Sequence, residues 1–311
     1  MRFAPTDQQQ DLLDGLGRLL DRYAGPQRAR EVGGDAPRYD TDLETRFVAA
    51  GFADVAGDPG AGPLEAELVT EAAARAAGVA ALGAISLVVP GLGLSSVETP
   101  VAIAASPVIG PVRFAADART LLLLRGDEAI VCDLSGEDTV EVDSRYGYPM
   151  ARLRHEPVGV SLGPASGALL AAWWRVAVTA ELVGTMDAAF SIALDHVRTR
   201  QQFGRSIGSF QAVQHRLAET TVLIEGSRWL VREAAHLGAP SEQAAIAACY
   251  AISAAQRVFM EVHQLSGAIG FATEHDLHIF SMRLPTLVQE ARSISPDAAA
   301  VTALRWAGPP D

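Results

Sequence analysis

The 311-residue chain has little of what marks secreted or nucleic-acid-binding proteins. Its two cysteines, Cys132 and Cys249, lie far apart and in no metal-ligand spacing, which favours a reducing compartment over a disulfide framework. Lys and Arg total 25 against 37 for Asp and Glu, and the formal net charge of -12 argues against a nucleic-acid or anionic-membrane partner. Residues 1–5 include no apolar segment of a secretion signal. The expected location is cytoplasmic.

Long hydrophobic runs are also missing. The longest, residues 168–180, contains Arg175 and is followed by Glu181. It falls short of the roughly 18 apolar residues that a membrane-spanning helix needs. The run therefore predicts a buried core helix and no membrane partner.

Metal-binding patterns are absent as well. Glu233 and His236 have the spacing of one di-iron ligand pair, but the chain lacks the second pair that such a site requires. His275 and His278 are three residues apart, and we expect them at the start of a helix rather than around a metal. The sequence also lacks a Gly-rich phosphate loop and a nucleophile elbow. We predict no metal site.

What the chain does contain separates into three zones. Residues 1–96 have the apolar spacing of helices, beginning with a capping box at Thr6 and Gln9. A loop rich in Gly and Pro should follow the first helix, and further helices are predicted at residues 41–50 and 63–81. Residues 97–162 carry short β-prone runs separated by Gly, Pro and Asp, which predicts a small antiparallel β domain with a hairpin turn at Gly126-Asp127. Residues 163–311 return to long helical patterns, with helices predicted at about 165–200, 209–237 and 241–266. A fourth helix should start near Thr273 and be interrupted at Pro285, and a short last one should begin at Ser295. The predicted fold is mainly α: an N-terminal α domain, a middle β domain and a C-terminal four-helix bundle.

Two motifs in the third zone have chemistry suited to a nucleotide. Arg200 precedes the turn Phe203-Gly204, where one helix should end, and Gln211 lies in the first turn of the next helix. A guanidinium fork and a helix N-terminus both favour phosphate oxygens. The second motif runs from Gln264 to Phe271 and includes Gly267, where a ligand could approach the backbone closely.

Together, these two motifs resemble the signatures of the acyl-CoA dehydrogenase family. The first, residues 198–219, is similar to the family's Arg-x-x-Phe-Gly turn, and the second to its Gln-x-x-Gly-Gly-x-Gly-Phe run. The resemblance implies that FAD is the cofactor and that five residues contact the adenosine diphosphate half of FAD in the neighbouring subunit. These residues are Arg200, Phe203, Gln211, Gln264 and Gly267.

The catalytic base that the family uses is not where the resemblance would put it. Family members remove an α proton from an acyl-CoA with a glutamate and pass the β hydrogen to the flavin as hydride. A count without gaps from Phe271 puts Ala291 at the glutamate's place, one residue after Glu290. A one-residue helical step rotates a side chain by about 100°, so Glu290 is not expected to take this role. Other members carry the base on the first bundle helix, at the position of Trp174. We therefore predict no catalytic residue in this chain.

The β zone lacks the residues with which the family holds the flavin ring. Its nearest counterpart to the family's Thr-Glu-Pro run is Val97-Glu98-Thr99-Pro100, and all four tryptophans lie in the third zone. The chain therefore has residues that match the family's site for the adenosine half of FAD, but it lacks those that match the site for the flavin ring. The residues 267–278 look like those of shortened subunits in actinobacterial heteromeric enzymes that oxidise steroid-derived CoA thioesters.

The resemblance thus implies a non-catalytic subunit of an FAD-dependent acyl-CoA dehydrogenase. Its expected partners are a catalytic subunit in an α2β2 assembly, an acyl-CoA substrate, and an electron-transfer flavoprotein or a similar acceptor. Two alternatives stay open: a self-sufficient homo-oligomeric dehydrogenase that uses Glu290, and a flavin-free structural bundle.

Overall fold

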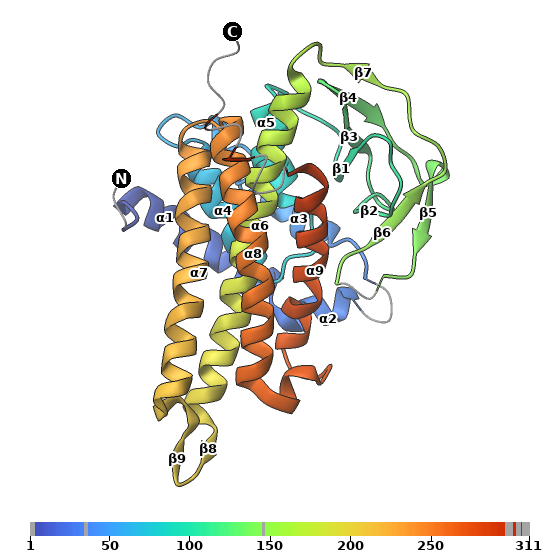
Figure 1. The fold of residues 1–311 in the computed structure, drawn as a ribbon. Coiled ribbons are helices and arrows are strands. Elements are labelled where there is room, and N and C mark those ends of the chain that lie inside the picture. Colours follow the sequence, from blue (N-terminus) through green and yellow to red (C-terminus); the bar gives the residue numbers. More distant parts are fainter. Residues whose placement is uncertain (1–3, 34–36, 145–146, 296–300, 303–305, 307–311) are drawn as a thin grey trace.

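The computed structural model describes residues 4–33, 37–144, 147–295, 301–302 and 306. A bundle of long helices forms one side of the molecule and a small β region packs beside its upper end (Figure 1). The helices are α1 Asp7–Tyr23, α2 Pro26–Gly33, α3 Thr41–Ala49, α4 Pro63–Arg75, α5 Val89–Gly91, α6 Ser166–Thr199, α7 Gln211–His236, α8 Ser241–Ser266 and α9 Leu277–Ile294. The strands are β1 Val101–Ala105, β2 Val112–Arg113, β3 Thr120–Arg125, β4 Glu128–Asp133, β5 Thr139–Val142, β6 Met150–Leu153, β7 Val160–Ser161, β8 Gln201–Gln202 and β9 Arg205–Ser206.

Helices α1 and α3 lie near their predicted positions, whereas α2 occupies a segment that was expected to be a loop. The Thr6 hydroxyl accepts from the Gln9 backbone N–H and the Gln9 side chain accepts from the Thr6 N–H, which confirms the capping box of α1. Helix α4 is shorter than predicted: it ends at Arg75, and a π-helical turn, Ala84–Val88, follows a short connection. This turn packs against α6 and lines the cleft described below.

The β region differs from its prediction in one pairing. Strand β1 pairs with β3 in parallel, whereas β3–β4 and β4–β7 are antiparallel and complete a four-stranded sheet. The parallel pair arises because β2 leaves this sheet to pair with β6 in a second one, β2-β6-β5, so the chain returns to β1 in the same direction. The turn at Gly126-Asp127 joins β3 to β4 as the predicted hairpin, and Gly126 has the positive φ that such a turn requires.

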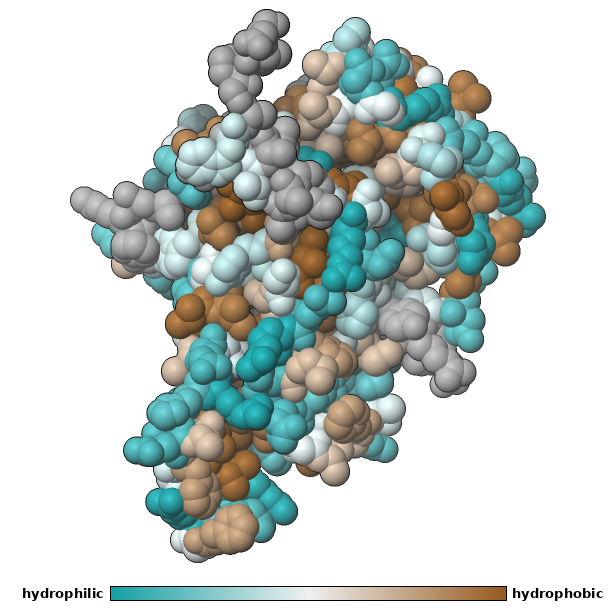
Figure 2. Space-filling model, viewed as in Figure 1, coloured by the Kyte–Doolittle hydropathy of each residue, from teal (hydrophilic) through white to brown (hydrophobic). Residues whose placement is uncertain are grey.

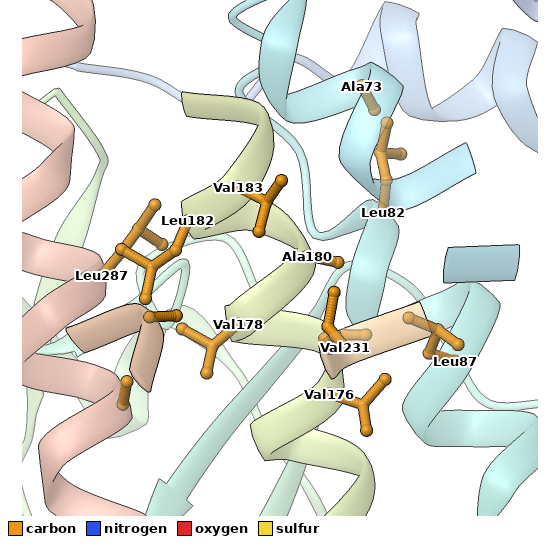
Figure 3. Close-up of a cluster of buried hydrophobic side chains, with 14 of the residues drawn as sticks. Ala73, Leu82, Leu87, Val176, Val178, Ala180, Leu182, Val183, Val231 and Leu287 are labelled. Carbon is orange, nitrogen blue, oxygen red and sulfur yellow. The ribbon is translucent and has the colours of Figure 1, made fainter. Parts of the chain in front are cut away.

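Helix α6 is the centre of the bundle. It packs against α4, α7, α8 and α9, and its apolar run is buried from Leu170 to Ala180 except at Arg175, as predicted, whereas Ala168 and Leu169 are exposed. By length and composition α6 and α8 could each cross a membrane, but 78% of the apolar window of α6 is buried within this fold. Figure 3 shows Val178 and Leu182 of α6 lying toward Leu287 of α9, with Leu82 on the other side of the helix.

Pro285 does not interrupt α9, contrary to the sequence expectation. The helix runs from Leu277 to Ile294 with Pro285 inside it, and it begins four residues later than predicted. A proline removes one backbone hydrogen bond from a helix. Here its ring is on the exposed side while Leu284, Leu287 and Val288 are buried, and this packing keeps the helix continuous. The short last helix expected from Ser295 falls largely outside the described residues.

Candidate functional site

The five residues expected to hold the nucleotide gather at one end of the bundle. Arg200 caps the C-terminus of α6, Phe203 lies in the β8–β9 turn, and Gln211 is the first residue of α7. Gln264 and Gly267 lie at the C-terminal end of α8. The hairpin β8–β9 projects from the lower end of the bundle (Figure 1).

A salt bridge shows why the α7 and α8 residues share this end. Arg216 Nη1 of α7 lies 2.7 Å from Glu261 Oε2 of α8, and the two helices pack side by side. Gln211 precedes Arg216 by five residues and Gln264 follows Glu261 by three. At about 1.5 Å rise per residue, both amides lie within about 8 Å of the bridge along their helix axes, on the same side of it.

The nucleotide candidates are exposed and available. Arg200, Gln211 and Gln264 are exposed, and within the described part of the chain their side chains make no hydrogen bond or ion pair. Gly267 has a φ of 63°, and a Cβ there would meet nothing within 4 Å. Figure 2 shows apolar side chains among polar ones on this projecting end. A guanidinium, two amides and a helix N-terminus form a donor set that fits a diphosphate.

Phe203 is held in an unusual conformation at the hairpin turn. Its backbone φ is 54° and that of Gly204 is 79°, so both turn residues are left-handed. This conformation favours Asn, Asp or Gly, and a phenylalanine adopts it at a cost. The Phe203 ring is nevertheless 90% exposed and meets the Phe210 ring edge to face, with the Arg205 guanidinium 4.1 Å from the Phe210 ring. The hairpin thus presents an aromatic ring to solvent.

A second constellation lies at the junction of the β region and the bundle. Trp174 Nε1 donates a 2.7 Å hydrogen bond to Glu290 Oε1. Arg113 of β2 donates to the same carboxylate, with Nε 2.7 Å from Oε2 and Nη2 3.1 Å from Oε1. The gapless count favoured Ala291, but Ala291 is fully buried in the core and Glu290 faces the cleft. Glu290, one residue before the counted position, therefore lies beside Trp174, the other position considered for a base.

Arg113 also joins a second carboxylate. Its Nη1 lies 2.7 Å from Glu181 Oε2, and the side chains of both residues are about one-tenth exposed. Burial raises the pKa of Glu181 and Arg113 opposes that rise. Burial by itself would lower the pKa of Arg113, but Glu181 and Glu290 together hold the pKa above its ordinary value. The guanidinium therefore stays charged.

The sequence reasoning missed Arg113 and Glu181 as members of this cluster. Glu181 interrupts a long apolar run on α6, seven residues after Trp174, so both residues lie on one helical face. A carboxylate inside a buried helix needs a partner, and this requirement was the available signal. Arg113 lies within a short β run, and nothing in the sequence pointed to its partners.

The cleft around Glu290 is narrow, and apolar side chains line it beside the charged Arg113, Glu181 and Glu290. The cavity volume is about 20 Å³, enough for roughly one water molecule. A three-ring flavin does not fit there. The part of the chain that the structure describes also holds no group of three or more potential metal ligands. The apolar lining residues are Ala81, Ala84, Val101, Ile103, Phe114, Ala177 and Val178.

Comparison with known proteins identifies relatives of the chain. Residues 169–292 match the family model described as acyl-CoA dehydrogenase, C-terminal domain. The acyl-CoA dehydrogenase IpdE2 of Mycobacterium tuberculosis is 36% identical over 108 residues, which is 35% of this chain and 34% of that protein. IpdE2 of Mycolicibacterium smegmatis is 26% identical over 295 residues, 89% of this chain and 92% of that protein.

Solved structures have the same fold. The ChsE4-ChsE5 complex from Mycobacterium tuberculosis contains a chain that superposes with a TM-score of 0.77 at 20% identity, covering 100% of both chains. The Tcur3481-Tcur3483 steroid ACAD variant superposes with a TM-score of 0.77 at 22% identity over 96% of each chain. Residues 169–292 thus form an acyl-CoA dehydrogenase C-terminal domain, and the chain as a whole is similar to IpdE2 of Mycolicibacterium smegmatis.

Proposed function

We propose that the chain is a non-catalytic subunit of a heteromeric, FAD-dependent acyl-CoA dehydrogenase. In such an enzyme bound flavin would supply the acceptor for the hydride that leaves the acyl β carbon. The partner subunit would supply the glutamate that takes the α proton and the cleft that holds the flavin ring. This chain would supply the residues that bind the adenosine diphosphate half of FAD.

One contrast within the chain carries this proposal. The donors at the lower end of the bundle, Arg200, Gln211 and Gln264, are exposed and unpaired within the described residues. Glu290, the carboxylate that contacts Trp174, already accepts three hydrogen bonds in a cleft too small for a flavin. A chain built this way can hold a phosphate group at its end but not a flavin ring in its own cleft.

In the proposed site, each residue acts by binding or orienting. Arg200 would hold the diphosphate oxygens with its guanidinium N–H groups. Gln211 donates its amide beside the N-terminus of α7, whose backbone N–H groups favour the same anion. Gln264 and the open backbone at Gly267 border the adenosine, and Phe203 offers a flat apolar surface to it.

The assembly and the substrate belong to the same proposal. The similar structures are of paired proteins, ChsE4-ChsE5 and Tcur3481-Tcur3483, which supports a two-subunit enzyme, for which we propose an α2β2 stoichiometry. The second pair is described as a steroid ACAD, which supports a steroid-derived CoA thioester as substrate. An electron-transfer flavoprotein or similar acceptor would then reoxidise the flavin.

The proposal is tested by flavin retention in the co-expressed complex. Arg200→Ala should release FAD more readily, measured as flavin absorbance per complex after gel filtration. Arg198→Ala is the matched control, because Arg198 is also exposed, lies two residues away and, among the described residues, pairs with Asp195 at 3.7 Å. Equal flavin content in the two variants would contradict the assigned role of Arg200.

A further inference from the structure

The cleft beside β2 has the features of a binding site for a carboxylate. Three N–H groups converge on one carboxylate: Nε and Nη2 of Arg113 and Nε1 of Trp174. The paired geometry of Arg113 matches the two oxygens of Glu290. The side chains of Glu290 and Arg113 are 15% and 11% exposed, so water competes little for these bonds.

Arg113 is fixed independently of Glu290. Its third nitrogen, Nη1, binds Glu181 at 2.7 Å. Its guanidinium carbon lies 4.8 Å from the Phe114 ring and 5.0 Å from the Tyr148 ring, both distances suited to cation–π attraction. These contacts hold the cation in place when the Glu290 side chain is removed, so the donors stay aimed at the same point.

Trp174 is fixed as well. Its side chain is buried at 3% exposure on α6, the most enclosed helix of the bundle. The neighbouring residue, Arg175, donates to the Ile294 carbonyl at the end of α9, with Nε at 2.8 Å. This bond joins the two helices one turn beyond Glu290. The distance between the indole and the last turns of α9 is therefore set by the backbone and not by Glu290 alone.

Apart from Glu181, which is already bound to Arg113, the other walls of the cleft are apolar, and they leave room for little besides the carboxylate. Side chains of Val101 and Ile103 from β1, and of Ala177 and Val178 from α6, line it. Charged hydrogen bonds are stronger in such surroundings than in water. A short aliphatic acid would place its carboxylate on the three donors and its methyl or ethyl group against these walls.

We infer that Arg113 and Trp174 form a carboxylate receptor and that Glu290 is its resident ligand, supplied by the chain itself. Because Glu290 is attached beside the receptor, its effective concentration excludes free carboxylates from the unmodified protein. The resident carboxylate also joins the β region to the bundle and shuts the cleft to larger molecules. This inference concerns the chain's own cleft and does not depend on FAD or on a partner subunit.

Chemical rescue tests the inference. In the full chain, Glu290→Ala should lower the melting temperature by several degrees, because it leaves Arg113 and Trp174 without their acceptor. Acetate or propionate should restore at least half of that loss in a saturable way, whereas sodium chloride at equal ionic strength should not. In ¹H–¹⁵N spectra, the Trp174 indole resonance should move in Glu290→Ala and return when acetate is added.

Two further variants decide between the receptor and a general salt effect. Rescue by acetate should be absent in Arg113→Met/Glu290→Ala, which keeps the cavity and removes the cation. If Glu290→Ala does not fold, Glu290→Gln keeps the side-chain volume, and its Trp174 resonance should still differ from that of the unmodified chain. Equal acetate rescue in the double variant, or an unmoved indole resonance, overturns the inference. So does a Glu290→Ala chain that melts at the original temperature.

Discussion

Trp174 of α6 and Glu290 of α9 share a 2.7 Å hydrogen bond, although 116 residues separate them in the chain. A double-mutant cycle with Trp174→Phe and Glu290→Gln measures how much this bond contributes to stability. We expect an interaction energy of about 0.5 to 3 kcal/mol, the range for residues in one hydrogen-bond network. Urea unfolding of the four proteins provides the measurement. Additive changes would mean that the indole and the carboxylate act independently.

The helix contact at Gly184 gives a second prediction. A Cβ at this position of α6 would lie 2.1 Å from the Glu71 carbonyl oxygen of α4, so Gly184→Ala must push the two helices apart. We expect a loss of about 1 to 3 kcal/mol in the free energy of unfolding. Gly17→Ala is the control: a Cβ on α1 there meets nothing within 4 Å. It should stabilise by about 0.5 to 1 kcal/mol, because alanine is the better helix former.

A buried ion pair between α4 and α7 gives a third prediction, which concerns stability. Arg228 Nε lies 2.7 Å from Glu71 Oε1, and the two side chains are 11% and 9% exposed. Arg228→Met leaves Glu71 with only Arg232 and should cost about 3 to 5 kcal/mol. Arg257→Met removes a 58% exposed arginine from Glu261, which keeps Arg216, and should cost less than about 1 kcal/mol. Similar losses in both variants would contradict the importance of burial.

His263 predicts a dependence of stability on pH. Burial lowers the pKa of His263, and His278 lowers it further. The ring lies between Phe259 and Phe271, with centroids 4.7 and 4.5 Å away. A group with a lowered folded-state pKa contributes stability fully above its unfolded value, about 6.5 for histidine, and loses it as the pH falls through the folded pKa.

His263→Phe should therefore reduce the loss of stability between pH 7 and pH 5. Urea midpoints at several pH values, with the exposed His215→Gln as control, measure this effect. If the pH dependence of His263→Phe equals that of the unmodified chain, the buried imidazole is not its source.

Much of the helical part of the fold could be read from local sequence. The capping box at Thr6, the hairpin at Gly126 and the bounds of α7 and α8 depend on neighbouring residues, and these features were predicted within a few positions. The turn Phe203-Gly204 was located for the same reason. Local hydrogen bonds and periodicity are sufficient to define such elements.

Features that depend on long-range packing were not predictable in this way. The continuity of α9 through Pro285 depends on burial against the bundle, and the parallel pairing of β1 and β3 depends on β2 joining another sheet. The contact of Arg113 with Glu290 joins residues 177 positions apart. Counting along one helix could not reveal that Glu290, rather than Ala291, faces the cleft.

The most direct measurement is the flavin content and acyl-CoA-dependent dye reduction of the chain purified alone and with its co-expressed partner. We expect a colourless, inactive chain alone and a yellow, active complex whose activity survives Glu290→Gln. A yellow chain that reduces dye by itself, and loses this activity in Glu290→Gln, would contradict the account and establish Glu290 as a base.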